Sequence, residues 1–425
     1  GKYYLTHDID LGGVEGLSPM GTTAANFTGS FDGCGHSIRG LALDSSADAD
    51  LGLFGKTKNA VIRDLAVYGS VTSSYPGAVV GGIVGTADPG TIIAGCENHA
   101  AVTYRNPAKA AKGVGGIAGY LYAGGSYLGA VVKDCKNCGA VVSSSGGNEA
   151  CAGGIVGVVR DNGNGVCTVM RCENNGDISG DGIKVGGIAG YVMQAASGGG
   201  ADILDCRNDG GVTSTKGRTG GIVGYVYSVS VTEGNAPTMA RCMNTGCVHG
   251  GTGYEIGGIL GYSVVCTLSD CVNLGEVTAD DDKEIGGVVG KTYTTTNGLV
   301  SEIRRCYTVD YAVIPNGCHE KPDYFVFTDC AAATERMILD GETALPFGRD
   351  GYFCAADGLM PTALHAPLEA GDVNADGQTD IRDTLGILRA VLDGKAPQNA
   401  FLADVNEDGG YTLFDVLITL RWIAD

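Results

Sequence analysis

Short apolar runs separated by glycine or asparagine follow one another along most of this 425-residue chain. In the opening stretch GKYYLTHDIDL, apolar and polar residues alternate, which predicts a strand with Tyr3, Leu5, Ile9 and Leu11 on or near one face. Later runs are short and rich in Val and Ile, and Gly alone accounts for 72 residues. The pattern therefore predicts a mainly β protein with many tight corners.

A doublet motif recurs, in which two glycines are followed by Ile or Val, one further residue and another Gly. The copies return at a nearly constant interval, and LGLFG at 51–55 looks like an earlier, divergent copy. The doublets are Gly81-Gly82, Gly115-Gly116, Gly153-Gly154, Gly186-Gly187, Gly220-Gly221, Gly257-Gly258 and Gly286-Gly287.

A second motif follows the first six doublets and consists of Cys, Asn two places later, and Val or Ile six places later. Leu65 takes the Cys place in an earlier copy, and the pattern decays after Cys306. The six full copies begin at Cys96, Cys135, Cys172, Cys206, Cys242 and Cys271, and their Asn residues are Asn98, Asn137, Asn174, Asn208, Asn244 and Asn273.

A fixed period with short β-type runs indicates stacked units, each of about three short strands. Identical residues recur once per unit, so stacking would form ladders of like side chains along one axis. The sequence predicts a parallel β-solenoid, a right-handed β-helix, of about eight or more coils whose strands lie about 4.8 Å apart. A propeller is the alternative, although its blades usually need four strands and about 40 or more residues.

The chain has 16 Cys residues, and one of them per coil at a single register predicts a buried ladder of small apolar side chains. Disulfides between coils are an alternative, because a spacing of about 4.8 Å falls within the range that disulfides bridge. A metal site is a weaker alternative, based on the spacings Cys135/Cys138 and Cys247/His249.

Four tyrosines directly follow doublet motifs: Tyr120, Tyr191, Tyr225 and Tyr262. Rows of aromatic rings can stack on sugar rings. Here the rings would lie only about 4.8 Å apart, so we expect them to stack on one another and leave no room for a sugar between them.

The repeated doublet and C-x-N-x-G-x-V motifs, with FTGSFDGCGHSIRGL near the start, resemble the GLUG-motif repeats of bacterial surface proteins. The resemblance covers roughly residues 1–313 and implies a solenoid domain and an extracellular or cell-surface location. It implies no particular activity, because such repeats accompany many different functions.

The charge of the chain narrows the choice of partners. The formal net charge is −20, which argues against nucleic acid and anionic membranes as partners. No run of about 18 apolar residues occurs, so we expect no membrane insertion. These features fit a secreted or surface-attached protein, or one that binds divalent cations.

Two boundaries follow from the loss of the repeat. Residues 1–313 form the predicted solenoid, and residues 314–366, which break the period, are expected to cap its last coil. Residues 367–425 differ in composition and carry the strongest chemical motif of the chain.

That motif is DVNADGQTDIRD at 372–383, which matches the calcium loop of an EF-hand. Such a loop places oxygen donors at positions 1, 3, 5, 9 and 12, a backbone carbonyl at position 7 and Gly at position 6. The donors here are Asp372, Asn374, Asp376, Asp380 and Asp383, with the carbonyl of Gln378.

The loop occurs a second time, at 404–415, as DVNEDGGYTLFD. Its donors are Asp404, Asn406, Asp408, Thr412 and Asp415, with the carbonyl of Gly410. Each copy opens a helix-like run, so two solvated acidic turns are a poor alternative. Pro367 and Pro397 interrupt the segments before the loops, which distinguishes them from a sensor EF-hand.

A duplicated loop-helix unit in the last part of the chain resembles a dockerin. The resemblance implies two structural calcium ions and docking onto a cohesin module of a scaffold protein, as in cellulosome-type assemblies. In that family, loop positions 10 and 11 and the middle of each helix contact the cohesin. The matching residues are Ile381, Arg382, Leu388, Arg389, Leu413, Phe414, Leu420 and Arg421. Leu388 and Leu420 could instead belong to the core of the module.

Three functions remain open for the solenoid. The first is a non-catalytic surface or adhesion module that binds a glycan or a host or cell-surface protein. The second is a polysaccharide lyase or glycoside hydrolase, which would need clustered carboxylates. The acids in TADDDKE (Asp280, Asp281, Asp282, Glu284) and GDISGDG (Asp177, Asp181) are the candidates, but both segments are typical of solvated corners. We find no catalytic motif. The third function is a fibre-forming structural subunit.

Overall fold

The computed structural model describes most of residues 1–309 and selected parts of the remainder. Residues 107, 125–127, 146–149, 164, 196–198, 229–235, 253, 281–283 and 295–297 are outside the described set. Beyond 309, the described parts are 325–328, 331–333, 353–354, 362–363, 371, 373, 379, 381–393, 403, 405 and 412–424.

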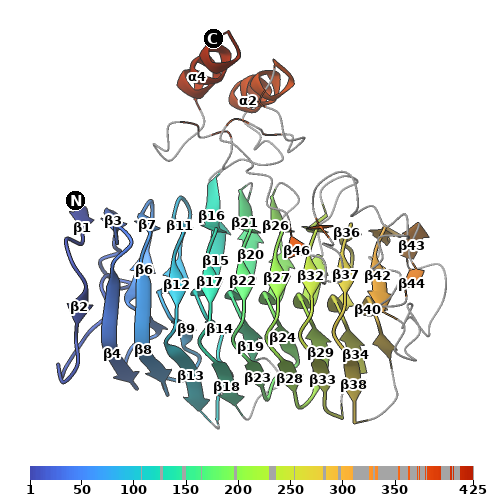
Figure 1. The fold of residues 1–425 in the computed structure, drawn as a ribbon, viewed down its shortest axis with the longest axis horizontal. Coiled ribbons are helices and arrows are strands. Elements are labelled where there is room, and N and C mark those ends of the chain that lie inside the picture. Colours follow the sequence, from blue (N-terminus) through green and yellow to red (C-terminus); the bar gives the residue numbers. More distant parts are fainter. Residues whose placement is uncertain are drawn as a thin grey trace.

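The described strands stack in coils along one axis and form four parallel sheets (Figure 1). Sheet A contains β1 (Lys2–Tyr4), β3 (Ser30–Asp32), β7 (Val61–Arg63), β11 (Ile92–Ala94), β16 (Leu128–Lys133), β21 (Val166–Met170), β26 (Gly200–Leu204), β31 (Thr238–Ala240), β36 (Thr267–Ser269), β41 (Ser301–Arg304) and β43 (Phe325–Thr328). Sheet C contains β6 (Phe54–Thr57), β10 (Val84–Ala87), β15 (Ala118–Gly124), β20 (Val156–Asn162), β25 (Ala189–Gln194), β30 (Val223–Ser228), β35 (Leu260–Ser263) and β40 (Val289–Thr292).

The other two sheets complete each coil. Sheet D contains β5 (Asp50–Leu51), β9 (Val79–Gly81), β14 (Gly113–Gly115), β19 (Cys151–Gly153), β24 (Lys184–Gly186), β29 (Gly217–Gly220), β34 (Tyr254–Gly257) and β39 (Ile285–Gly286). Sheet B contains β2 (Ile9–Asp10), β4 (Ser37–Ser45), β8 (Ala66–Ser73), β12 (Glu97–Asn98), β13 (Ala101–Asn106), β17 (Lys136–Asn137), β18 (Val141–Ser145), β22 (Glu173–Asn174), β23 (Ile178–Gly180), β27 (Arg207–Asn208), β28 (Val212–Ser214), β32 (Met243–Asn244), β33 (Val248–Gly250), β37 (Val272–Asn273), β38 (Val277–Ala279), β42 (Tyr307–Val309) and β44 (Ala331–Ala333).

Equivalent motif residues of neighbouring coils pair in parallel. Asn98 pairs with Asn137, which pairs in turn with Asn174. Val102 and Val141 pair in the same way. These pairings confirm the parallel β-solenoid and exclude the propeller, whose blades are separate sheets.

A full coil holds five short strands, as in β14 to β18, and the expected number of about three is wrong. The second Gly of the doublet lies between the strands of sheets D and C, and the Asn is the last residue of the first of two strands of sheet B. Gly116 and Asn137 are the corner residues of this coil. Backbone turns therefore divide each apolar run into shorter strands. The pattern of side-chain types does not show where these turns lie.

The doublet and the Asn motif meet inside the solenoid. A β-carbon on Gly116 would lie 2.4 Å from Oδ1 of Asn137 and 2.2 Å from the carbonyl oxygen of Gly154, so only Gly fits. Nδ2 of Asn137 donates hydrogen bonds to the carbonyl of Gly139 and to Oδ1 of Asn174, each at 2.8 Å. Repetition of these bonds produces a buried ladder of amides, which satisfies polar groups that would be costly to bury unpaired.

The core runs the length of the coils and consists mainly of Val, Ile, Leu and Ala, with a Cys at the same register in successive coils. Cys96, Cys172 and Cys206 are fully buried and have free thiols. The thiol of Cys172 donates to the carbonyl oxygens of Met170 and Val132, at 3.2 and 3.7 Å. The predicted buried thiol ladder is confirmed, and the ladder positions carry no disulfide.

The segment expected to cap the solenoid is described only in part. β43 and β44 lie in this segment and pair in parallel with β41 and β42, so sheets A and B extend into it. β45 (Phe353–Cys354) and β46 (Thr362–Ala363) form a separate antiparallel pair. Near the C-terminus lie two helices, α2 (Ile381–Asp393) and α4 (Leu413–Ala424) (Figure 1).

Candidate functional site

The two C-terminal helices begin at the same place in the two acidic loops. α2 starts at position 10 of the first loop and α4 at position 10 of the second. A small core joins them, formed by Val373, Ile387, Ala403, Val405 and Val416, with Leu388, Val391 and Ile418 packed against it. Val373 and Val405 occupy the same position in the two loops, so the halves of this module contribute matching residues to one core.

Asp415 connects the start of α4 to the preceding loop. Its carboxylate oxygen Oδ2 accepts hydrogen bonds from the backbone nitrogen and hydroxyl of Thr412, at 2.7 and 3.1 Å. Oδ1 accepts from the backbone nitrogen of Val405 at 2.9 Å. Thr412 directly precedes the helix, so the bond from its backbone nitrogen to the side chain of Asp415, three residues later, corresponds to one half of a capping box. The last acid of the loop is thereby held at the point where the loop becomes a helix.

The structure describes only part of the predicted calcium ligands. Asp383 and Asp415, at position 12 of the two loops, are both fully buried, and Thr412 is exposed. The other predicted ligands lie outside the described residues, and they are Asp372, Asn374, Asp376, Gln378, Asp380, Asp404, Asn406, Asp408 and Gly410. A buried carboxylate needs hydrogen bonds or a cation, so the described pair is compatible with calcium ligation.

Most of the predicted partner-binding residues lie on the surface of the helices. Six are exposed, namely Ile381, Arg382, Arg389, Leu413, Leu420 and Arg421. Leu388 is half-buried against the core of the module, in line with the alternative that it is a core residue. The side chain of Phe414 lies outside the described set.

Four exposed apolar residues of the two helices are absent from the sequence-based candidates, namely Leu385, Leu392, Leu417 and Ile423. Leu385 is 46% and Leu417 is 61% exposed, and they stand at equivalent positions of the two helices. The sequence holds a signal for them, because the duplication places Leu at both positions. Sequence reasoning misses it because leucines at helical spacing suggest a core face, whereas the buried face of α2 contains Thr384, Ile387 and Ala390.

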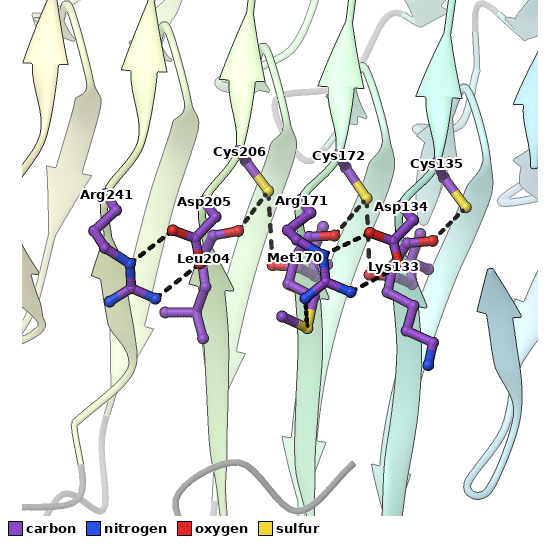
Figure 2. Close-up of polar contacts among 12 residues, drawn as sticks. Lys133, Asp134, Cys135, Met170, Arg171, Cys172, Leu204, Asp205, Cys206 and Arg241 are labelled. Carbon is purple, nitrogen blue, oxygen red and sulfur yellow. Dashed lines mark hydrogen bonds and ion pairs between the residues drawn. The ribbon is translucent and has the colours of Figure 1, made fainter. Parts of the chain in front are cut away.

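Carboxylates and guanidinium groups of the solenoid alternate along one of its corners (Figure 2). Nε and Nη2 of Arg171 donate to the two carboxylate oxygens of Asp134, at 2.6 and 2.7 Å. Arg241 binds Asp205 in the same bidentate way, at 2.7 and 2.8 Å. Arg305 and Asp270 form a third such pair. We call these six residues the Asp–Arg ladder.

Each ladder residue directly precedes a motif Cys and has a positive φ, for example 54° at Asp134 and 46° at Arg171. This backbone region disfavours a long side chain such as Arg, and the bidentate ion pair offsets part of that cost. The sequence analysis misses the alternation of Asp and Arg because it compares only the repeated Cys and Asn positions.

Three of the buried thiols, Cys135, Cys167 and Cys206, are poorly suited to nucleophilic chemistry. Burial raises the pKa of Cys135 and Cys206, and it raises the pKa of Cys167 to about 12. A thiol reacts and binds metals as the thiolate. Among the described residues, no group of three or more His, Cys, Asp or Glu could hold a metal ion.

Three of the acids that were candidates for glycosidase-like chemistry have partners within the solenoid, Asp177 and Asp280 on a neighbouring coil and Glu284 on its own coil. Oδ1 of Asp177 accepts a hydrogen bond from the backbone nitrogen of Gly211 at 2.9 Å. Asp280 lies 3.5 Å from Nε2 of His249, and Glu284 forms an ion pair with Lys291 at 2.7 Å. Residues 281–283 are outside the described set.

The expected stacking of the tyrosine row occurs for one pair. The rings of Tyr191 and Tyr225 stack, with centroids 5.1 Å apart and an interplanar angle of 20°. Those of Tyr225 and Tyr262 are also 5.1 Å apart but are tilted by 58°. Tyr120 is separated from this stack, because Val158 occupies the row position on the intervening strand β20.

Comparisons with known proteins bear mainly on the C-terminal module. A solved structure from Bacteroides ovatus, provisionally named as an immunoglobulin A1 protease, is 16% identical, with a TM-score of 0.41 and 85% of each chain covered. No curated protein matches the chain. Within the part that the structure describes, no helix combines the length and apolarity that bilayer crossing requires. Residues 370–421 match the dockerin type I domain, a domain that binds calcium and a cohesin module.

Proposed function

We propose that this protein is a non-catalytic extracellular or cell-surface β-solenoid, anchored to a scaffold protein by calcium-dependent binding of its dockerin to a cohesin. The observation that carries the proposal is the dockerin match at 370–421, together with two helices that begin at the same position of two duplicated acidic loops. Dockerin modules occur in extracellular cellulosome components, which supports the proposed location.

Each loop is proposed to hold one calcium ion. The duplication gives each loop its own set of oxygen donors, and each loop has a fully buried acid at position 12. Residues 371–425 contain ten acidic and four basic residues, so two divalent cations would offset most of the repulsion among the acids and couple folding to metal binding.

The cohesin-binding face is proposed to combine exposed apolar residues with arginines. On α2 these are Ile381, Leu385 and Arg389, and the equivalents on α4 are Leu413, Leu417 and Arg421, all of which are exposed. Because both helices present the same set, the dockerin offers two related faces. Exposed apolar side chains flanked by arginine are typical of protein interfaces.

The solenoid is proposed to serve as a GLUG-type surface module that binds its ligand without catalysing a reaction. Its most regular charged feature, the Asp–Arg ladder, is composed of bidentate ion pairs between coils. The acids Asp280 and Glu284 each face a basic side chain. Carboxylates held in such contacts are engaged within the protein and are not free to act on a substrate.

Titration of the full chain with a panel of type I cohesin modules in the presence of calcium tests the anchoring role. We expect one cohesin to bind. The double variant Asp383→Ala/Asp415→Ala should lose this binding, because each loop then lacks its position-12 ligand. The matched control Asp177→Ala/Asp280→Ala removes two solenoid acids and should bind as the wild type does. The proposal fails if no cohesin binds, or if both double variants bind equally well.

A further inference from the structure

Arg160 lies among tyrosines on the outer face of sheet C. Its strand, β20, has β15 on one side and β25 on the other. In this register Arg160 stands between Tyr122 and Met193, and Val158 stands between Tyr120 and Tyr191. Tyr120 and Tyr191 are thus two strand spacings apart, roughly 9.6 Å, and do not stack on each other as Tyr191 and Tyr225 do.

The guanidinium of Arg160 is hydrogen-bonded to the hydroxyl of Tyr120, and Tyr122 and Tyr191 also lie within its electrostatic reach. Nε of Arg160 is buried and has no hydrogen-bond partner. Within the part of the chain that the structure describes, Arg160 forms no ion pair, whereas Arg171, Arg218 and Arg241 each bind a carboxylate. A partly desolvated cation without a counter-ion is unfavourable, so the site is suited to an anionic ligand.

A second cation, on the neighbouring coil, contacts the same tyrosine row. Nζ of Lys184 is 4.5 Å from the centre of the Tyr191 ring, and this lysine is only 6% exposed. Further along the same face, Arg218 lies over Tyr225 and Tyr262 but is bound to Glu255 at 2.6 Å. Arg160 is therefore a cation that no described carboxylate binds, although the chain as a whole has a net charge of −20.

We propose that the patch formed by Tyr120, Arg160, Lys184 and Tyr191 binds a uronic acid unit of an acidic glycan. The planar guanidinium suits the bidentate recognition of a carboxylate. The two tyrosines offer apolar ring surface and a hydroxyl group, which suits a sugar ring with an apolar face and hydroxyl substituents. An acidic peptide would supply a carboxylate but no such ring. This binding site goes beyond the proposed anchoring role and does not depend on it.

Calorimetric titration of the calcium-loaded full chain with short galacturonate and glucuronate oligomers tests the proposal. We expect at least one of these oligomers to bind. The methyl ester of the same oligomer, which lacks the charge, should bind about tenfold more weakly or not at all. Poly-glutamate of similar length should also bind weakly, because it offers carboxylates without sugar rings.

Substitutions of Arg160 test whether the oligomer binds at this patch. Arg160→Gln should weaken binding about tenfold or more, as expected for the loss of a charge-assisted hydrogen bond, and Arg160→Lys should fall between this variant and the wild type. The matched control is Arg39→Gln, because Arg39 also lies over a tyrosine, 4.4 Å from the Tyr68 ring centre, but on sheet B. This control should bind as the wild type does.

Four results would overturn the proposal. They are no binding of either uronate by the wild type, equal binding by Arg160→Gln, equal binding of the methyl ester, and equal binding of poly-glutamate. Cohesin binding by the same variants should be unchanged. A failure of the glycan proposal is therefore distinguishable from a failure of the dockerin proposal.

Discussion

Arg171 binds both carboxylate oxygens of Asp134, a residue that lies one coil earlier in the solenoid. The Arg171 side chain is 12% exposed and that of Asp134 is 43% exposed. Asp205, on the following coil, also acts electrostatically on Arg171. The Asp–Arg ladder is therefore a sequence of alternating charges in which Arg171 lies near two acids.

Exchanging the partners of one pair tests this alternation. The double variant Asp134→Arg/Arg171→Asp keeps an ion pair but places an aspartate next to Asp205. We expect it to be less stable than the wild type by about 1 kcal/mol, because like charges then adjoin in a partly exposed site. Chemical denaturation of both proteins at low and at high salt measures the difference, which should shrink at high salt. A swapped variant as stable as the wild type would show that the pairs act independently.

The second glycine of a doublet has no space for a side chain. Gly116→Ala should destabilise the solenoid by about 3 kcal/mol or more, because its β-carbon would overlap Asn137 and the backbone of Gly154. Gly200→Ala is the matched control, since the nearest atom to its added β-carbon, in Val166, is 3.8 Å away. That variant should change stability by less than about 1 kcal/mol. Equal effects of the two substitutions on thermal unfolding would contradict this account of the doublet.

The buried Asp161 should make the stability of the folded protein depend on pH. It is fully buried, and burial raises its pKa from 3.8 to about 7. Between these values the folded state holds a proton that the unfolded state has lost, so this residue makes stability fall as pH rises from about 4 to 7. Asp161→Asn should therefore gain stability relative to the wild type at pH 8 and not at pH 4. Thermal unfolding at both pH values, with the exposed Asp177→Asn as control, checks the sign of the effect.

Calcium removal should act on the dockerin alone. The single tryptophan of the chain, Trp422, lies in α4, so its fluorescence reports on this module. We expect a chelator to change the fluorescence of Trp422 while the β-sheet signal in circular dichroism stays constant, because the described solenoid contacts are hydrogen bonds, ion pairs and apolar packing. Loss of the β-sheet signal on chelation would mean that the solenoid also depends on metal.

The solenoid is readable in the sequence because its corners repeat the same residue types. Gly116 and Asn137 belong to separate motifs, and the structure shows that they fit against each other. The number of strands per coil is not predictable in this way, because the corners that divide an apolar run are backbone turns. The alternation of Asp134 and Arg171 becomes readable only after the coils have been placed in register.

The C-terminal calcium-loop module, like the solenoid, is predictable from the sequence only in part. The duplicated loops indicate where α2 and α4 begin, because loop length sets the start of each helix. The exposed positions Leu385 and Leu417 are not predicted, since helical spacing alone does not show which face is buried in so small a module. Arg160 gives no sequence signal, because its neighbours Tyr122 and Met193 belong to other coils and adjoin it only across strands.

The most direct test of the central claim is calorimetric titration of the full chain with its type I cohesin, before and after calcium removal. The account predicts tight one-to-one binding with calcium, none after chelation, and full recovery when calcium is added back. Binding that persists in the absence of calcium, or a calcium-loaded protein that binds no cohesin, would contradict it.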